Sequence, residues 1–154
     1  MNIIVAIDIK NGIGKNSKIP WNYPLDLQHF RKLTLHNTVL MGRKTWDSLP
    51  STVKPLSWRL NIVLTRNKKL KFPKQVLVIH NFESIPWDKI KGKLFIIGGQ
   101  DIYKHALKQC NRIYCTKIYN DYNCDRFFPE FLNDFELEKT INSEKDLDFF
   151  IFKR

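Results

Sequence analysis

The sequence of 154 residues has few cysteines and no long apolar run. Its three cysteines, Cys110, Cys115 and Cys124, form no Cys-x-x-Cys pair, and their odd number does not suit a disulfide framework. The longest apolar stretches, such as Asn2 to Ile9, are far shorter than the ~20 residues that a membrane-spanning helix needs. No apolar leader precedes the first strand-like segment. We therefore expect a soluble, cytoplasmic protein that does not interact with membranes.

Signatures of metal sites and of nucleophilic catalysis are also missing. The histidines lack the spacing with cysteines or carboxylates that a metal site needs. Neither a Gly-x-Ser-x-Gly motif nor a Cys/His nucleophile arrangement is present. We therefore expect a functional site without a metal ion and without a serine or cysteine nucleophile.

The net charge of +11 is the extreme feature of the composition. It fits three interpretations: a nucleic-acid partner, a polyanionic small ligand, or a lysine-rich composition without a functional role. Lysines are spread along the whole chain, and the Lys/Arg-Gly-Phe/Tyr pattern typical of RNA-recognition modules is missing. The charge alone decides nothing, but without that pattern we do not expect nucleic-acid binding.

Short β-branched and aromatic runs predict a series of strands along the first three quarters of the chain: Ile3 to Ile7, Thr38 to Met41, Asn61 to Thr65, Val76 to Ile79, Leu94 to Ile97 and Ile113 to Lys117. Helix-sized segments lie between several of them, notably Pro24 to Thr34 and Asp101 to Lys108. This alternation is typical of a largely parallel sheet with crossover helices on both faces.

The C-terminal part of the chain has a different pattern. Phe135 to Ile141 and Leu147 to Phe152 are separated only by the turn-like residues 142–145, which predicts an antiparallel hairpin. The predicted fold class is therefore α/β, with a mixed, mainly parallel central sheet, an antiparallel C-terminal hairpin and flanking helices. We expect residues 1–154 to form one domain.

A glycine-containing segment, Gly12-Ile13-Gly14, follows the first predicted strand and resembles the start of the dinucleotide-binding G-x-G-x-x-G motif. That motif needs a helix to begin on its glycines, which residues 19–24 with their two prolines do not allow, and Ser17 replaces the third glycine. We interpret Ile9 to Tyr23 either as a flexible lid over a site or as an ordinary surface connection.

Asp26 is a candidate functional acid in the predicted helix Pro24 to Thr34. An acid in the first turn of a helix is also a common stabilising feature, because it interacts favourably with the helix dipole. Here, however, the spacing places Asp26 on one helix face with Phe30 and Leu33. In apolar surroundings its pKa would rise, which would suit a proton donor or an anchor for a cation.

Three strand-to-helix junctions could hold phosphate groups. They are Gly42-Arg43-Lys44-Thr45, the segment from Thr65 to Lys69, and Gly98-Gly99. Main-chain amides, cations and a hydroxyl are the groups that a pyrophosphate needs, and glycines let the backbone approach a ligand closely. Each junction alone is also compatible with an ordinary turn. Together, at one edge of a parallel sheet, they indicate a dinucleotide site.

Arg59 lies just before the predicted strand Asn61 to Thr65. A solvated loop arginine is one interpretation. If the side chain enters a cleft instead, its planar guanidinium group would bind a carboxylate through two parallel hydrogen bonds.

An ordered series of short segments resembles the dihydrofolate reductase family over essentially the whole chain. The series is Ile3-Ile4-Val5-Ala6, Asn11-Gly12-Ile13-Gly14, Ile19-Pro20-Trp21 with Pro24 and Asp26, Val39 to Trp46, Arg59-Leu60-Asn61, Ile97-Gly98-Gly99 with Tyr103, and Phe128-Pro129. The resemblance implies a monomeric enzyme that uses NADPH to reduce dihydrofolate to tetrahydrofolate, with a hydride added at pterin C6 and a proton at N5.

The resemblance also implies roles for individual residues on the substrate side. The catalytic residues would be Asp26, Thr116 and Trp21, of which Asp26 resembles the active-site carboxylate of the family and Thr116 the hydroxyl that orients it. The pterin, aminobenzoyl and glutamate contacts would be Ile4, Val5, Ala6, Leu27, Phe30, Leu49, Ile97 and Arg59, of which Arg59 would clamp the glutamate α-carboxylate.

On the cofactor side, the resemblance implies contacts with NADPH from several segments. These are Ala6, Ile13, Gly14, Gly42, Arg43, Lys44, Thr45, Leu64, Thr65, Arg66, Gly98, Gly99, Gln100, Asp101, Ile102 and Tyr103. Residues Ile9 to Tyr23 would be the mobile active-site loop, and Asp125 would steady it. Gly98 and Gly99 match a glycine pair that the family usually links by a cis peptide.

The sequence departs from the family pattern at two places. Ser57-Trp58 stands where Pro-Gly is more usual before the arginine, and Ile19 stands where Met or Leu is common. Two alternatives to the family's function remain. One is the pyrimidine reductase of riboflavin synthesis, which shares the fold and the cofactor but lacks the Trp-x-x-Pro-x-Asp arrangement. The other is a basic nucleic-acid-binding domain, which only the net charge favours.

Overall fold

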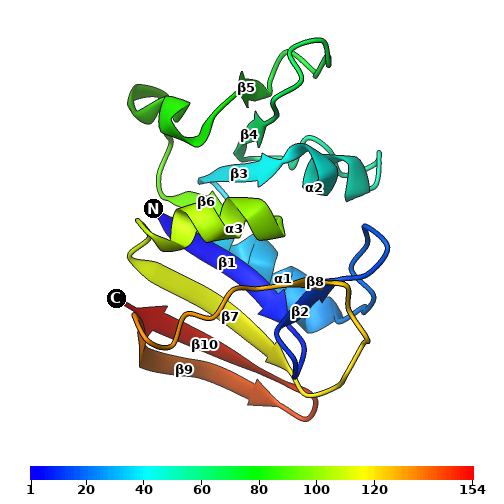
Figure 1. Cartoon of the computed structure of the whole chain (residues 1–154), viewed down its shortest axis with the longest axis vertical. Helices are drawn as coiled ribbons and strands as arrows, with labels where there is room; N and C mark the ends of the chain where they lie inside the picture. The colour runs from blue at the N-terminus through cyan, green and yellow to red at the C-terminus, as the bar shows by residue number, and fades with distance from the viewer.

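The computed structural model describes all 154 residues, apart from the side chains of residues 142–143. Eight strands form one sheet in the order β5-β4-β3-β6-β1-β7-β10-β9 (Figure 1). The parallel strands are β1 (Asn2–Ile7), β3 (Thr38–Gly42), β4 (Leu60–Leu64), β5 (Leu77–Ile79), β6 (Leu94–Ile96) and β7 (Arg112–Ile118). At one edge, β10 (Leu147–Lys153) pairs antiparallel with both β7 and β9 (Glu136–Glu144). The predicted fold class is confirmed.

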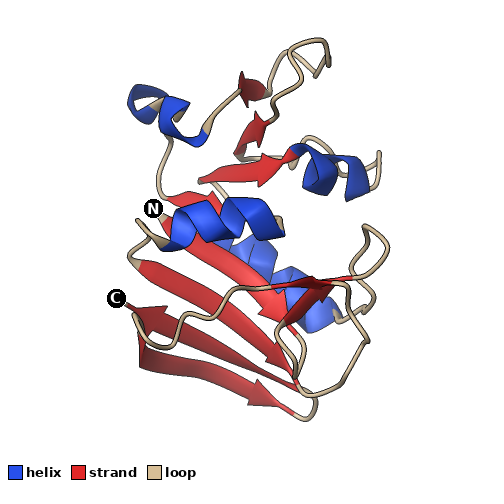
Figure 2. Ribbon diagram, in the orientation of Figure 1, coloured by secondary structure: helices blue, strands red, loops and turns tan.

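Helices cover both faces of this sheet, as Figure 2 shows in blue. The α-helices are α1 (Pro24–Thr34), α2 (Arg43–Ser48) and α3 (Gln100–Leu107), and two 3-10 turns follow β5, η1 (Phe82–Ser84) and η2 (Trp87–Lys89). In the view of Figure 1, α3 lies in front of the sheet and α1 behind it. The central strands are therefore buried on both faces, as expected for parallel strands joined by crossover helices.

Two apolar cores follow from the alternation of side chains along the strands. On β1, Ile3, Val5 and Ile7 point toward α3 and pack with Tyr103 and Ala106. Ile4 points the other way and packs with Phe30 and Leu33 of α1. A polar group on the α1 face of a strand is therefore separated by the sheet from everything on the α3 face.

Helix α1 has the bounds that the sequence predicts. Pro24 occupies the first turn, where its missing N–H costs no hydrogen bond. Asp26 lies near the positive end of the helix dipole, and Arg31 and Lys32 lie near the negative end. The Thr34 hydroxyl donates to the Phe30 carbonyl over 2.8 Å at the last turn. These features stabilise α1 and set its bounds.

The segment Ile9 to Tyr23 contains a strand that the sequence analysis does not predict. Residues of β2 (Gly12–Gly14) pair antiparallel with β8 (Arg126–Phe127), and Figure 1 shows this small sheet beside the C-terminal end of β1. Both strands are too short for a periodic hydrophobic pattern, and the two glycines lower the β propensity of the segment. The pairing joins the N-terminal loop to a segment more than 100 residues away.

The predicted position of the hairpin turn, residues 142–145, is wrong. Strand β9 continues to Glu144, and Lys145 and Asp146 form the turn before β10. The side chains of Asn142 and Ser143, which belong to the predicted turn, lie outside the described residues. Polar residues suggest a turn in the sequence, but β9 is an edge strand, where polar side chains are tolerated and limit pairing with other chains.

Candidate active site

A hydrogen-bonded pair of acid and hydroxyl lies between α1 and β7. The Thr116 hydroxyl, whose residue is 3% exposed, donates to Oδ1 of Asp26 over 2.7 Å. Burial raises the pKa of Asp26 above its ordinary value, and the hydrogen bond from Thr116 opposes part of that rise. The site therefore contains a desolvated carboxyl group with increased affinity for a proton.

Strand register determines which residues share the face of Asp26. Ala6 is paired with Thr116, and Ile4 precedes Ala6 by two positions on the same face of β1. Apolar residues of the predicted substrate pocket gather there in one cluster: Ile4, Phe30, Leu49 and Ile97. Leu27 of α1 is 59% exposed next to this face. A carboxyl group with apolar neighbours on a flat strand face can accommodate a planar heterocycle.

The structure does not bring the side chain of Val5 to this face. Val5 lies between Ile4 and Ala6, so the twofold period of a strand turns it toward α3, where it packs with Tyr103 and Cys115. Its side chain is therefore separated from Asp26 by the sheet, unlike those of the other residues predicted for the substrate pocket.

Arg59 is held over the C-terminal half of α1. Its Nε donates to the Ser57 carbonyl over 2.9 Å and its Nη1 donates to the Thr34 hydroxyl over 3.1 Å. The guanidinium carbon lies 5.9 Å from the centre of the Phe30 ring. Burial and the nearby charge of Arg31 lower the pKa of Arg59, so an anion bound there would relieve an unfavourable environment.

The unusual residue before Arg59 adopts the backbone geometry of a glycine. Trp58 has φ 59°, a region that bulky residues rarely enter, and the residue is 72% exposed. Its carbonyl accepts a hydrogen bond from the His36 amide over 2.8 Å. The Ser57-Trp58 departure therefore leaves Arg59 directed toward α1.

Glycines bring the ends of β3 and β6 together. The Gly42 amide donates to the Gly98 carbonyl over 2.8 Å, and a cis peptide joins Gly98 to Gly99. A Cβ atom on Gly98 or Gly99 would lie 3.3 or 3.4 Å from the Thr45 hydroxyl. The main chain is thus open to close approach at the edge where helices α2 and α3 begin.

A cavity of about 470 Å³ lies between the N-terminal loop and α2. Polar residues line it, three of them cationic: Asn16, Ser17, Lys18, Arg43, Lys44, Asp47 and Ser48. Nη1 of Arg43 lies 2.6 Å from the Asp47 carboxylate, in an ion pair within α2. The cavity therefore offers cations and hydroxyl groups of the kind that bind phosphates.

The second cationic junction follows β4. Thr65 is buried, and its hydroxyl accepts a hydrogen bond from the Asn67 amide over 3.2 Å. The neighbouring Arg66 is exposed. Nδ1 of His80 lies 2.8 Å from the Thr65 carbonyl. All three predicted junctions thus lie at the carboxyl edge of the parallel strands, the position where open α/β sheets bind ligands.

Side chains of α3 contact neighbouring segments of the site. The Gln100 amide oxygen accepts the Phe127 amide over 2.8 Å, which ties α3 to β8. The buried Tyr103 hydroxyl donates to the Ile4 carbonyl over 2.9 Å, and burial raises the pKa of Tyr103. Ile102 packs against Gly42. The side chains of Gln100 and Tyr103, both predicted as cofactor contacts, thus hold neighbouring segments of the site together.

The N-terminal loop is tied to the segment after β7. Asp125 accepts the Asn16 amide on Oδ2 over 3.0 Å and donates its own amide to the Gly14 carbonyl over 3.0 Å. The Trp21 ring lies 5.2 Å from that of Tyr122, and Trp21 also packs into the cluster that contains Ala6. The loop therefore lies over the site, with Asp125 in the position that the resemblance implies.

Sequence reasoning missed several residues of this arrangement. Asn16, Ser17 and Lys18 line the cavity, and Asp8 and Tyr122 join the loop to the rest of the protein. For Asp8 a signal existed, since it is an acid inside the apolar run from Asn2 to Ile9. For the others the sequence gives none, because their roles depend on contacts with distant segments.

The dihydrofolate reductase family model matches residues 1–152 of the chain. The chain belongs to the dihydrofolate reductase family. Its identity to dihydrofolate reductase of Staphylococcus aureus is 35% over 147 residues, or 95% of this chain and 89% of that protein. Its structure resembles that of Enterococcus faecalis dihydrofolate reductase complexed with NADP(H) and RAB-propyl, with a TM-score of 0.87, 34% identity and coverage of 99% of this chain and 95% of that chain.

A plant relative shows the same domain within a longer protein. The chain is 39% identical over 145 residues to the bifunctional dihydrofolate reductase-thymidylate synthase 2 of Arabidopsis thaliana. The match covers 82% of this chain but 26% of that enzyme, so the chain spans about a quarter of its length. The likeness therefore lies in one part of the plant enzyme.

The reaction of this family member is the NADPH-dependent reduction of dihydrofolate, so the predicted family, cofactor and overall reaction are confirmed. Within the described part of the chain, no helix has the length and apolarity to cross a membrane. The described residues also contain no group of three His, Cys, Asp or Glu side chains placed to hold a metal ion.

Proposed function

We propose that Asp26 is the catalytic carboxylate of this reductase and that Thr116 orients it. The observation that carries this proposal is the desolvated carboxyl group of Asp26, held by the buried Thr116 hydroxyl on an otherwise apolar face. In such surroundings a negative charge strongly stabilises positive charge on a bound ring. Asp26 therefore favours protonation at N5 of the pterin, which makes the adjacent C6 a better acceptor of hydride.

The substrate contacts divide between apolar walls and one cation. Ile4, Phe30, Leu49 and Ile97 lie on the Asp26 face and would exclude water from the ring. Arg59 would bind the glutamate α-carboxylate, since its position is fixed by Thr34 and Ser57 and its burial favours an anionic partner. The ring and the tail of the substrate would thus be bound by opposite ends of α1.

The residues at the carboxyl edge of the sheet fit a phosphorylated dinucleotide. Gly42, Gly98 and Gly99 leave space for close approach, and Arg43, Lys44, Thr45 and Arg66 supply cations and a hydroxyl. When bound, NADPH supplies the hydride. Arg43 and Arg66 would select it over NADH by contacting the additional 2′-phosphate.

We also propose that the chain functions as a monomer of one domain in the cytoplasm, without a nucleic-acid partner. The eight-stranded sheet takes strands from both ends of the chain, which supports one domain. Cys110 and Cys115 are buried free thiols, as a reducing compartment allows. Sedimentation at micromolar concentration would test the monomer, and a gel shift at physiological salt would test nucleic-acid binding.

The decisive experiment is Asp26→Asn, measured by single-turnover hydride transfer across pH. Asparagine retains the shape and can still accept the hydrogen bond from Thr116, but it lacks the charge. We expect the hydride step to slow by about 10²–10⁴-fold near neutral pH. The mutant rate should rise as the medium is acidified, because only solvent would then protonate N5. Binding of dihydrofolate should change less than the rate.

Asp88→Asn is the matched control, because it removes the same charge from an exposed residue of η2. It should leave the rate and its pH profile unchanged. An Asp26→Asn enzyme with a near-wild-type rate at neutral pH, or one whose loss does not ease in acid, would show that Asp26 only stabilises the start of α1.

A further inference from the structure

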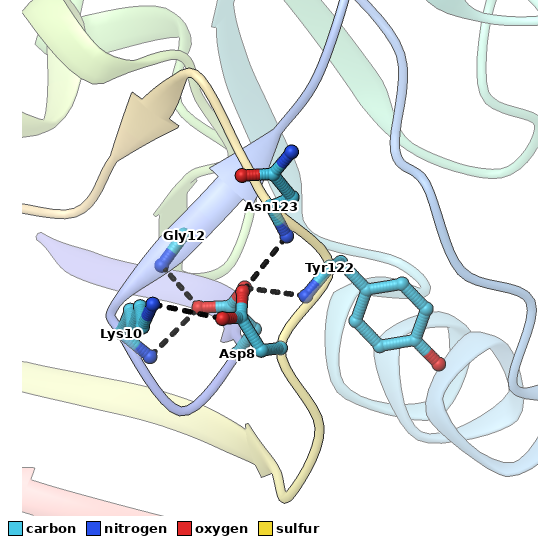
Figure 3. A network of polar contacts seen from close by, with 6 residues as sticks. Asp8, Lys10, Gly12, Tyr122 and Asn123 are labelled. Atoms are coloured by element: carbon cyan, nitrogen blue, oxygen red, sulfur yellow. Dashed lines mark hydrogen bonds and ion pairs between the residues drawn. The ribbon is translucent and has the colours of Figure 1, made fainter.

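Asp8, at the C-terminal end of β1, is a fully buried carboxylate that joins two loops (Figure 3). Its Oδ1 accepts the amides of Lys10 and Gly12 over 2.9 and 2.7 Å. Its Oδ2 accepts the amide of Tyr122, 114 residues along the chain, over 3.1 Å. Two of these donors belong to the active-site loop and the third to the segment after β7. Three amide donors around one carboxylate make a strong, charge-assisted link.

The surroundings of Asp8 are closely packed. A Cβ atom on Gly12 would lie 2.6 Å from the Cys124 sulfur and 2.9 Å from Oδ1 of Asp8, so this position has room only for glycine. Outside the buried carboxylate, the Lys10 ammonium group lies 2.9 Å from Asp121, which also accepts the Asn123 amide over 2.8 Å. The start of the active-site loop is thus fixed against the segment after β7.

Tyr122 connects the same point to the other end of the loop. Its hydroxyl lies 2.6 Å from the hydroxyl of Tyr23, and its ring lies 5.2 Å from the ring of Trp21. The hydrogen bond with Tyr23 raises the pKa of Tyr122 to about 12, so the hydroxyl stays protonated at neutral pH. Asn120 donates to the Tyr23 hydroxyl over 3.3 Å. The backbone of Tyr122 is therefore held by Asp8, while its side chain holds residues 21 and 23.

We propose that Asp8 and Tyr122 form a clamp that fixes both ends of the active-site loop and so positions Trp21 in the cluster that also contains Ala6. They are positioning residues, which act on the reaction through the loop; the proposal rests on the reductase activity. The clamp differs from the contacts of Asp125, which lie at the exposed middle of the loop. An amide at position 8 could not replace the carboxylate, because its NH₂ group would face one of the amide donors.

The test compares Asp8→Asn and Tyr122→Phe with Thr38→Val. The Thr38 hydroxyl is buried and bonds both the amide and the carbonyl of Lys91, so its loss destabilises the protein far from the loop. We expect Asp8→Asn to slow single-turnover hydride transfer about tenfold with little change in the KM for dihydrofolate. Tyr122→Phe should slow hydride transfer a fewfold. In the double variant the rate should fall by less than the product of the two separate decreases.

A second measurement reports on the loop without activity. Trypsin cleaves after lysine, and the main chains of Lys15 and Lys18 are hydrogen-bonded to each other in the folded loop. Cleavage after these two residues should therefore be severalfold faster in Asp8→Asn and Tyr122→Phe. Thr38→Val should not alter the relative rate at these two lysines. If Asp8→Asn fails to fold, Tyr122→Phe decides the question through both measurements.

The outcomes separate the clamp from the reductase activity itself. A wild-type enzyme that does not oxidise NADPH with dihydrofolate would overturn the function. An active wild type, together with Asp8→Asn and Tyr122→Phe variants that lose only stability and match Thr38→Val in hydride rate and cleavage, would overturn the clamp. Slow hydride transfer in the clamp variants, with fast cleavage at Lys15 and Lys18 and an unaffected Thr38→Val, supports it.

Discussion

The two ends of the proposed active site, the substrate end around Asp26 and the cofactor end around Arg43 and Arg66, use charge in different ways. At the substrate end, Asp26 is desolvated and held by Thr116, and burial raises its pKa. At the cofactor end, Lys44 and Arg66 are exposed and the Arg43 side chain is 40% exposed in an ion pair with Asp47. Water screens exposed charges, so each contributes little alone and several must act together. A single buried charge has a larger effect on its neighbour, which suits chemistry more than binding.

Arg59 lies between these extremes, since it is partly buried and two hydrogen bonds fix the position of its guanidinium group. If the contribution of a charged side chain increases with its burial, Arg59→Lys should raise the KM for dihydrofolate by roughly 10- to 100-fold. Lysine retains the charge but not the paired donors. Turnover of a dihydropterin without the glutamate tail should not change. Steady-state kinetics with both substrates would measure the difference.

Arg31→Lys provides the control for this experiment, as it makes the same exchange at an exposed neighbour on α1. It should leave both substrates unaffected. Equal losses for the two substrates in Arg59→Lys would assign Arg59 a structural role at the end of α1, through Thr34 and Ser57.

At the exposed cofactor end, Arg66→Ala should weaken the binding of NADPH by about tenfold and should hardly change the binding of NADH. The physical reason is that only NADPH carries the additional phosphate. Dissociation constants from fluorescence titration with both cofactors would measure the effect. Lys68→Ala removes an equally exposed cation two residues away and should have a smaller effect. If Arg66→Ala weakens both cofactors alike, Arg66 does not contact the 2′-phosphate.

The difference between the two ends also explains what the sequence could predict. The bounds of α1 follow from Pro24 and local charges, and the parallel strands follow from apolar runs, so Asp26 and the three junctions could be placed from local pattern. The direction of Val5 also follows from strand alternation, although the resemblance assigned it to the pocket.

Features that depend on distant partners could not be predicted in this way. The pairing of β2 with β8 and the hydrogen bond from the Tyr122 amide to Asp8 join segments more than 100 residues apart. The turn between β9 and β10 was misplaced because an edge strand tolerates the polar residues that usually mark a turn. In each case tertiary contacts, which one sequence does not show, override the local pattern.

The smallest predicted effect concerns the stability of the substrate end. Because folding raises the pKa of Asp26 above its ordinary 3.8, the protonated form favours the folded state. This contribution is fully present below pH 3.8 and is lost as the pH rises through the folded pKa, so at pH 7 the charged Asp26 destabilises the protein. Asp26→Asn removes that cost.

The melting temperature of Asp26→Asn at pH 7 should therefore exceed that of the wild type, by roughly 2–4 °C for each kcal/mol of relief. Its advantage should shrink as the pH falls toward 3.8, where the wild-type carboxyl becomes protonated. Thermal unfolding of both proteins across this range would measure it, with Asp88→Asn as the variant whose difference from wild type should not follow this course. A mutant less stable than the wild type at pH 7 would mean that the folded protein favours the charged carboxylate. The contrast between a desolvated acid and solvated cations would then fail, because Asp26 would be as well stabilised as the exposed charges of the cofactor end.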